Sequence, residues 1–469
     1  MKITLDNCII IEQPTFEMLT YCKTHLVVDN PDYIKKERMG KWTGSTPAEI
    51  QLFEKVGDRL YVPFGVWDRG FYDRFRPQFV SVTSQIDPIR KVFYGSSINL
   101  YPYQEKAVTE ALRAKNGVLV MPCGAGKTQT ALEIVARLGG RCLWLTHTQD
   151  LLNQSMCRAK SVYNLPGNMY GTITSGKVNI SEGITFATVQ TLCKVDLAKY
   201  KHFWDIIIVD EAQHCCGSPT RVTQFYKVLS RLSARYKIGL TATPKRADGL
   251  EVAMFALLGQ IIHEVPKSEV ADTTCPVNIK YIDTGYMPDL DIALSGDGTL
   301  NYTGLVDDLT HNADRYDIVF GEALSATLKG PTLVLANRVE YLQQMQEDMR
   351  GCGRRSLCLS AMGMSKKAKE TRREALRQLN NGELECILAT YQLAKEGLDV
   401  PNLRYVVFAT PEKDDTTVTQ AAGRVGRKAE GKDHGTVIDM VDDFGMLRGW
   451  QRQRERIYKK LGFCIDIEQ

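Results

Sequence analysis

Residues 122–128, Pro-Cys-Gly-Ala-Gly-Lys-Thr, have the composition of a phosphate-binding loop. Glycine leaves the backbone free of Cβ clashes, so N–H groups can point at phosphate oxygens at the positive end of a helix dipole. Lys127 is expected to reach the β- and γ-phosphates of a nucleotide, and the Thr128 hydroxyl to hold Mg²⁺. Where the full motif begins with a glycine, this chain has Met121. The loop residues expected to line the nucleotide are Cys123, Gly124, Ala125 and Gly126.

The sequence on either side of this loop supports the interpretation. Residues 117–121 are predicted to form a short buried strand. Apolar residues then recur at i, i+3, i+4 and i+7 from Ala131 to Leu138, which predicts one buried face of a helix. A strand, a glycine loop and a helix in this order are the context that a phosphate-binding loop requires.

Two acidic residues, Asp210 and Glu211, end the most apolar stretch of the chain, residues 203–209. Asp210 is expected to ligate Mg²⁺ partly through water, because Mg²⁺ dehydrates reluctantly. Glu211 would orient the attacking water or act as its base, and Gln213 would sense the γ-phosphate. Taken alone, the acidic pair could instead cap a helix and interact with its dipole. Its place at the end of a strand in the same predicted sheet as the loop favours the metal and water roles.

A pair of arginines, Arg424 and Arg427, lies in residues 420–427, Gln-Ala-Ala-Gly-Arg-Val-Gly-Arg. Their spacing predicts that both guanidinium groups leave one helical face. Planar and permanently charged groups suit the charge that develops on a transferring phosphoryl group. An exposed basic helix is the alternative. Glycines at 423 and 426 favour the first interpretation, since glycine inside a helix costs about 1 kcal/mol relative to alanine and suggests a packing need.

Strands alternate with helices on both sides of a polar connection at 265–310. This alternation predicts an α/β fold with two doubly wound parallel sheets, whose ligands lie at the carboxyl ends of the strands. The predicted domains are an accessory α+β domain at 1–95, a first lobe at 96–268, a second lobe at 269–446 and a basic tail at 447–469. The second lobe has no phosphate-binding loop.

The composition limits the partners. The chain has 469 residues and a net charge of +4, so a nucleic-acid surface must be a local patch. Its 13 cysteines contain no Cys-x-x-Cys pair, and no zinc site is expected. No apolar run approaches the ~18–20 residues of a membrane span. Scattered cysteines and the lack of a signal peptide predict a cytoplasmic location.

Three charged stretches leave their roles open. Aromatic residues alternate with arginines at 67–79, which suits either a nucleic-acid surface or a packed domain seam. The basic helix predicted at 365–379 is interpreted as a solvated face. The basic stretch at 447–460 could contact DNA or serve solubility.

Taken in order, these motifs resemble those of superfamily 2 helicases and translocases. Residues 121–128 resemble motif I, 210–213 motif II in a DEAQ form, 241–243 motif III, 390 with 396–399 motif V, and 420–427 motif VI. Residues 102–107 and 122–127 are most similar to the XPB-type and phage repair helicases. Arg246-Ala-Asp248 stands where that group has Arg-Glu-Asp, with Ala247 in place of the glutamate.

The resemblance implies two RecA-like lobes behind a small N-terminal domain, with ATP and Mg²⁺ between the lobes. Gln104 would read adenine, Arg424 and Arg427 would be arginine fingers, and Gly397 with Asp399 would approach the nucleotide. Coupling of hydrolysis to motion is implied for Gln213, Thr241, Thr243 and Gln420. Contacts with the nucleic-acid backbone are implied for Thr148, Thr188, Arg246, Asn337 and Thr390.

The expected function is hydrolysis of ATP to move along or unwind branched or duplex DNA, in DNA repair or recombination. The compact length is similar to phage-encoded members, which would place the protein in the host cytoplasm. Two alternatives remain: an RNA helicase, and a duplex DNA translocase that does not separate strands. A scaffold without hydrolysis is disfavoured, because Lys127, Asp210, Glu211 and both arginines are present.

Overall fold

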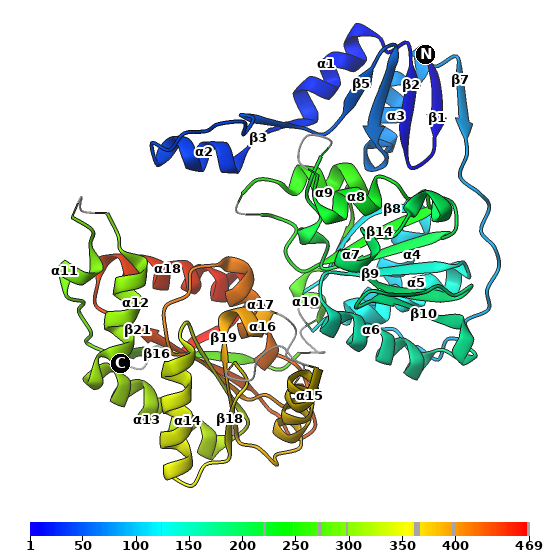
Figure 1. The fold of residues 1–469 in the computed structure, drawn as a ribbon. Helices are drawn as coiled ribbons and strands as arrows, with labels where there is room; N and C mark the ends of the chain where they lie inside the picture. The colour runs from blue at the N-terminus through cyan, green and yellow to red at the C-terminus, as the bar shows by residue number, and fades with distance from the viewer. Residues whose placement is uncertain are drawn as a thin grey trace. The chain divides into compact units, whose positions relative to one another are not determined.

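The structure, a computed structural model, describes residues 1–122, 124–218, 222–246, 248–270, 274–296, 299–360, 366–395 and 400–466. The chain divides into two compact units (Figure 1). The first unit comprises Met1–Pro122 and Gly126–Pro266, and the second comprises Lys267–Gln469 together with Cys123–Ala125. Each unit contains a large sheet of mostly parallel strands, so the predicted α/β fold with two doubly wound sheets is confirmed.

The N-terminal part of the first unit is a five-stranded sheet. Its order is β5 (Glu54–Val56), β6 (Arg59–Pro63), β2 (Cys8–Glu12), β1 (Lys2–Leu5) and β7 (Ser81–Ser84). Alternate residues of β1, β2 and β6 face one apolar cluster, which α1 (Phe16–His25) and α3 (Arg69–Phe75) cover. A separate two-stranded sheet, β3 (Val27–Asp29) and β4 (Glu49–Gln51), flanks α2 (Pro31–Arg38).

The aromatic and arginine stretch at 67–79 belongs to this packing. Phe71 and Phe75 are buried, and Trp67 stacks on Phe79. The guanidinium group of Arg74 lies 5.3 Å from the ring centroid of Tyr21 and also pairs with a glutamate of α1. Of the two alternatives for this stretch, the structure supports the packed seam.

The eight-stranded sheet of the first unit follows the N-terminal part. Its order is β11 (Lys177–Asn179), β10 (Tyr170–Thr174), β12 (Ile184–Thr188), β9 (Cys142–Thr146), β13 (Ile206–Asp210), β14 (Tyr236–Thr241), β8 (Asn116–Val120) and β15 (Ile261–Glu264). All pairings are parallel except that of β10 with β11. The helices are α4 (Pro102–Ala114), α5 (Lys127–Leu138), α6 (Gln149–Val162), α7 (Val189–Leu192), α8 (Gln224–Leu229) and α9 (Glu251–Leu258).

The second unit has a seven-stranded sheet in which every pairing is parallel. Its order is β18 (Ser356–Cys358), β19 (Cys386–Thr390), β17 (Thr332–Ala336), β20 (Tyr405–Phe408), β21 (Gly435–Val441), β16 (Val277–Asp283) and β22 (Cys464–Asp466). Helices before or beside β16 and β17 are α10 (Lys267–Val270), α11 (Leu290–Ala293), α12 (Tyr302–His311), α13 (Ala313–Lys329) and α14 (Val339–Gly351). The later helices are α15 (Lys366–Asn380), α16 (Tyr391–Lys395), α17 (Asp415–Val425) and α18 (Gly445–Lys460).

Both faces of this second sheet are covered, as alternation along β17 shows. Leu333 and Leu335 belong to a cluster with residues of α15, α16, α17 and α18. Val334 and Ala336 belong to another cluster with residues of α13 and α14. Because successive side chains of a strand point to opposite faces, helices cover both sides of the sheet.

Residues 447–466 are part of this second fold rather than a separate basic tail. Leu447, Ile457 and Tyr458 of α18 are buried, and β22 pairs with β16. Even Arg454 is only 2% exposed. The predicted domain at 447–469 is therefore wrong, because buried residues at helical spacing, one of them a charged arginine, hold α18 against the sheet. Among the described residues, no helix has the length and apolarity that a membrane crossing requires.

The two sheets of the first unit meet along α9. Leu250, Ala253 and Ala256 belong to the N-terminal cluster, whereas Met254 and Leu257 belong to the core of the eight-stranded sheet. Polar contacts reinforce this seam: Lys201 pairs with Asp6 at 2.5 Å, and the Asn7 amide donates to the carbonyl of Ser230 at 2.6 Å.

Gly65, in the short 3₁₀ helix η1 (Phe64–Val66), lies against the last turn of α9. A Cβ on Gly65 would lie 2.7 Å from the Ala256 carbonyl oxygen and closer still to two other backbone atoms of that turn. Backbone cannot move aside as a flexible side chain can. Only glycine therefore allows this close approach of η1 to α9.

We expect Gly65→Ala to lower the free energy of unfolding by about 1 to 3 kcal/mol, the usual cost of overpacking. Thermal and urea unfolding followed by circular dichroism will measure it. The matched control is Gly70→Ala in α3, where the nearest atom to an added Cβ is a side-chain oxygen at 3.4 Å. Equal stability of the two variants would contradict the close packing at Gly65.

Candidate active site

The glycine loop joins β8 to α5 and has a conformation that only glycine adopts easily. Gly124 and Gly126 have φ values of 84° and 75°, in the left-handed region. A Cβ on Gly126 would also overlap the Nε2 atom of Gln104. Lys127 begins α5, and its Nζ atom donates to the carbonyl oxygen of Met121 at 3.5 Å. The lysine therefore folds back over the loop that precedes it. Cys123 lies outside the described residues.

Gln104 is buried beside this loop. Its Oε1 atom accepts the backbone N–H of Tyr101 at 3.0 Å, which caps the start of α4, and its amide nitrogen faces Gly126. Only 2% of the residue is exposed. The structure thus gives Gln104 a structural role at the loop, and its reading of adenine stays a prediction.

The acidic pair lies at the carboxyl end of β13, the strand between β9 and β14. Burial raises the pKa of the Asp210 carboxyl above its usual range, the charge of Glu211 raises it further, and the charge of Lys127 opposes the shift. Glu211 has a φ of 55°, which is uncommon for a residue with a side chain. This backbone bend turns the chain at the end of the sheet, directly after the buried aspartate.

Hydrogen bonds connect the acidic pair to the neighbouring strand. Gln213 donates from Nε2 to Oε2 of Glu211 at 2.7 Å and accepts at Oε1 from the Thr241 hydroxyl, also at 2.7 Å. Thr241 also accepts the N–H of Thr243 at its hydroxyl and that of Met121 at its carbonyl. One continuous path therefore joins the acid, the end of β14 and the start of the glycine loop.

A histidine that the sequence interpretation missed lies next to this path. The ring centroids of His147 and His214 are 4.1 Å apart. Burial, together with His214, lowers the pKa of His147 to about 4, and Glu211 opposes the shift. The only sequence signal was its position directly after the strand that became β9.

Arg246, predicted to contact nucleic acid, is engaged within the first unit. Its guanidinium group donates to the carbonyl of Gln213 and pairs with Asp248, at 2.8 Å and 2.6 Å for the two nitrogens. Its backbone N–H donates to Glu251, the first residue of α9. The arginine thus links the loop after β13 to α9. Ala247 lies outside the described residues.

The other residues predicted to meet nucleic acid lie where strands end and helices begin. The Thr148 hydroxyl accepts the N–H of Leu151 at the start of α6, and Thr188 ends β12. In the second unit, Thr390 ends β19, where it exchanges hydrogen bonds with Ser360. Asn337, after β17, donates to the carbonyl of Pro411. Their contacts with nucleic acid stay predictions.

The arginine motif lies in the second unit and differs from its predicted geometry. Gln420 and Arg424 belong to α17, and Arg424 is 7% exposed. The helix ends at Val425. Arg427 follows Gly426, donates its backbone N–H to the carbonyl of Arg424 and forms an isolated β-bridge with Thr274. The prediction that both guanidinium groups leave one helical face is therefore wrong for Arg427, because Gly426 ends the helix. Gly397 and Asp399 lie outside the described residues.

The residues of the first unit fit ATP with Mg²⁺. The glycine loop lies at the N-terminus of α5, where backbone N–H groups suit a bound phosphate, and Gly126 leaves room for the Gln104 amide beside it. A buried carboxylate beside a second carboxylate favours binding of a cation, because a positive charge stabilises the ionised form of both groups. Among the described residues, no group of three histidines, cysteines or acids could hold a metal ion by itself. Thr128 and Asp210 are the residues that would hold Mg²⁺, with phosphate and water oxygens as its further ligands.

Comparison with known proteins identifies two matching family models. Residues 97–246 match the family described as type III restriction enzyme, res subunit, and residues 316–429 match the helicase conserved C-terminal domain. The DNA 3'-5' translocase XPB2 of Sulfurisphaera tokodaii is 26% identical over 380 residues, which cover 74% of this chain and 82% of that protein. A protein of Acanthamoeba polyphaga mimivirus, which has the name of an ATP-dependent RNA helicase, is 25% identical over 93% of this chain and 79% of its own.

The fold is also similar to solved structures. The structure of Saccharomyces cerevisiae Dbp5 bound to RNA and ADP BeF3 aligns with a TM-score of 0.55 and 16% identity, over 78% of this chain and 90% of that one. At this identity the similarity concerns the fold alone.

We expect the stability of the first unit to depend on pH through His147. The folded state lowers its pKa to about 4 from an ordinary value of 6.5, so the unfolded chain binds the proton first as pH falls. Stability contributed by neutral His147 is complete above pH 6.5 and is lost towards pH 4. Between pH 7 and 5.5 the wild-type protein should lose about 1 kcal/mol more than His147→Gln.

Urea unfolding of both proteins at pH 7 and 5.5 measures this difference. His25→Gln, in an exposed position on α1, is the control and should keep the wild-type dependence on pH. A His147→Gln profile parallel to the wild-type profile would contradict the assignment.

Proposed function

The chain belongs to the superfamily 2 helicases, and we propose that it is an ATP-dependent motor that translocates along or unwinds branched or duplex DNA. Both family models, over residues 97–246 and 316–429, support the motor. The similarity to XPB2, which is named a DNA 3'-5' translocase, supports DNA as the substrate. It also agrees with the resemblance of residues 102–107 and 122–127 to the sequences of XPB-type helicases.

One observation of the structure carries this proposal. At the carboxyl edge of a single parallel sheet, the positive charge of Lys127 acts on the buried Asp210, and a hydrogen-bonded path joins Glu211 to Thr241. This edge is where open α/β sheets bind ligands. A general structural role would not require a buried aspartate and a half-buried glutamate next to a glycine loop.

When bound, ATP with Mg²⁺ supplies the phosphoryl group whose transfer to water drives the motor. In this chain, the glycine loop and Lys127 would bind the phosphates, and Thr128 with Asp210 would hold the metal ion. Gln213 fixes Oε2 of Glu211, so Oε1 is the atom that orients the attacking water and accepts its proton. Thr241 transmits a change at Gln213 to the end of β14.

We also propose that the arginines of the second unit complete hydrolysis when nucleotide is bound. Their permanent charge would stabilise the charge that develops on the transferring phosphoryl group. Arg424 is in the last turn of α17, whereas Arg427 follows the helix and forms an isolated β-bridge with Thr274.

An RNA helicase is the second candidate, and one observation favours it: the mimivirus relative, over 93% of this chain, has the name of an RNA helicase. A groove that follows the backbone of a nucleic acid need not distinguish DNA from RNA. The substrate test therefore has to include both polymers, with a 2'-hydroxyl in the tracking strand as the distinguishing group.

We expect ATP hydrolysis to be stimulated by forked or duplex DNA more than by single-stranded DNA or RNA. Steady-state phosphate release will be measured without nucleic acid and with each of these in turn. Lys127→Ala should lower the rate about 100-fold or more, since it removes the charge at the phosphates, while circular dichroism stays that of the wild type. Stimulation by RNA alone would overturn the DNA assignment, and retained turnover in Lys127→Ala would overturn the site.

We expect Arg427→Ala to lower kcat about 100-fold or more and to change ATP affinity less than roughly threefold. The reason is that an arginine finger stabilises the transition state rather than bound ATP. Single-turnover hydrolysis and titration with a fluorescent ATP analogue will separate the two quantities. Lys428→Ala, the exposed neighbouring cation, is the control. A large loss of affinity with unchanged turnover would make Arg427 a nucleotide-binding residue instead.

A further inference from the structure

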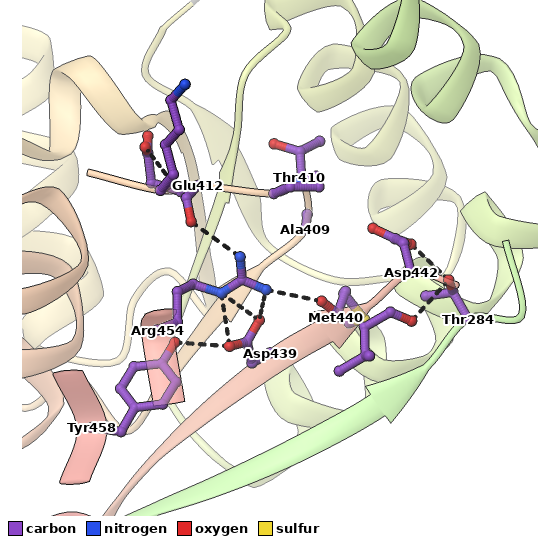
Figure 2. Close-up of polar contacts among 12 residues, drawn as sticks. Thr284, Ala409, Thr410, Glu412, Asp439, Met440, Asp442, Arg454 and Tyr458 are labelled. Carbon is purple, nitrogen blue, oxygen red and sulfur yellow. Dashed lines mark hydrogen bonds and ion pairs between the residues drawn. The ribbon is translucent and has the colours of Figure 1, made fainter. Parts of the chain in front are cut away.

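A short segment after β20, residues 409–413, leads into the helix that holds Arg424. Five successive carbonyl oxygens of this segment each accept a hydrogen bond from a side chain of another element, and Figure 2 shows the one between Arg454 and Glu412. The pairs are Ala409 with Arg315 at 2.9 Å, Thr410 with Tyr391 at 2.5 Å, Pro411 with Asn337 at 3.1 Å, Glu412 with Arg454 at 3.0 Å, and Lys413 with Gln453 at 3.1 Å.

It is unusual for side chains to donate a hydrogen bond to every backbone carbonyl of a connecting segment, since the carbonyls of surface loops commonly accept hydrogen bonds from water. The donors come from α13, α16, α18 and the connection between β17 and α14, so elements far apart in the sequence converge on five residues. Thr410 is additionally held through its hydroxyl, which accepts the N–H of Asn337 at 2.9 Å. We name residues 409–413 the clamped segment.

Two buried carboxylates hold the arginine donors in place: Asp439 lies in β21, and Asp442 directly follows that strand. Figure 2 shows Asp439 with Arg454 and Asp442 with Thr284. Asp439 accepts from Nε and Nη2 of Arg454, at 2.8 to 3.0 Å, and from the Tyr458 hydroxyl at 3.0 Å. Asp442 accepts from Nε of Arg315 at 2.6 Å and from the Thr284 hydroxyl at 2.6 Å.

These ion pairs lie deep in the second unit. Arg315 and Asp439 are 0% exposed, and Arg454 and Asp442 are 2% exposed. Buried pairs add little stability over an apolar packing of the same volume, because desolvation offsets their attraction. A geometric role accounts better for two such pairs, because one nitrogen of each arginine donates to the clamped segment.

The clamped segment determines where α17 starts. Asp414 follows it and caps α17 by accepting the N–H groups of Thr416 and Thr417. Gln453 also donates to the carboxylate of Asp415, the first residue of the helix, at 2.7 Å. A helix fixed at its start holds its later side chains at a defined position along and around its axis. Arg424 is in the last turn of this helix.

We propose that Arg454, Gln453, Tyr391 and Arg315 are positioning residues that hold α17, and with it Arg424, in the geometry that hydrolysis needs. This inference rests on the proposed function, because it assigns these residues to the hydrolysis attributed to Arg424. It gives α18 a role in ATP turnover in place of the DNA contact or solubility expected for its basic sequence. It also gives Asn337 a role in the segment that precedes α17.

The test uses substitutions that remove one donor and keep the volume. Tyr391→Phe removes the hydroxyl that bonds to Thr410, and Gln453→Met removes the amide that bonds to Lys413 and Asp415. We expect each to lower DNA-stimulated kcat about tenfold, since small displacements of a catalytic group have large effects on rate. KM for ATP should change less than about twofold.

The matched control is Gln344→Met, which replaces an exposed glutamine of α14 in the same unit that bonds only within its own helix. It should keep wild-type kcat. Thermal unfolding of every variant separates lost positioning from lost fold, because a merely structural role would lower the melting temperature without a selective loss of kcat.

A double variant that combines a donor substitution with Arg424→Ala tests whether the side chains that donate to the clamped segment act through Arg424. If they do, Gln453→Met should lower kcat in the wild type but cause no further loss in Arg424→Ala. Equal losses in both backgrounds, or unchanged kcat in both single-donor variants, would overturn the inference. Absence of ATP hydrolysis in the wild-type protein would instead overturn the proposed function, so the two failures are distinguishable.

Discussion

The burial of Asp210 is the constraint on which the active site of the first unit depends. The residue ends a strand with 5% of its surface exposed, and Glu211 is the next residue. Removing a carboxylate from water costs several kcal/mol unless a cation or several donors meet it. The strand order meets this requirement, because β13 and β14 with β8 beside them place Lys127 close enough for its charge to act on Asp210. The sheet thus determines which charges share its edge.

In the second unit, by contrast, the buried carboxylates are paired with donors from the protein itself. Asp439 receives donors from Arg454 and Tyr458, and Asp442 receives donors from Arg315 and Thr284. A carboxylate that the protein satisfies in this way is a rigid structural group. Asp210, whose pKa burial and Glu211 raise, is instead suited to an incoming cation. We therefore propose that the same residue type serves ligand binding in one unit and the alignment of a helix in the other.

The N-terminal sheet is tied to the eight-stranded sheet of the first unit through α9, which contributes side chains to two apolar clusters. Glu251 at the start of this helix accepts the backbone N–H of Arg246, and Arg246 donates to the carbonyl of Gln213. The helix that packs on the N-terminal sheet is therefore connected to the loop of the acidic pair. A separate accessory domain attached only by a linker would lack such a connection.

The sequence by itself determined the alternation of strands and helices, the glycine loop, the acidic pair and their common sheet edge, because periodicity and local motifs depend on neighbouring residues. It could not determine that Arg454 is buried, since a basic helix with one acidic residue reads as exposed until Asp439 of a distant strand is placed beside it. It also placed Arg427 on a helix that Gly426 ends. The contact of His147 with His214, the engagement of Arg246 and the five donors of the clamped segment depend on side chains from elements far apart in the chain. Only the tertiary structure decided these, because strand order and helix packing select which distant polar groups must satisfy one another away from water.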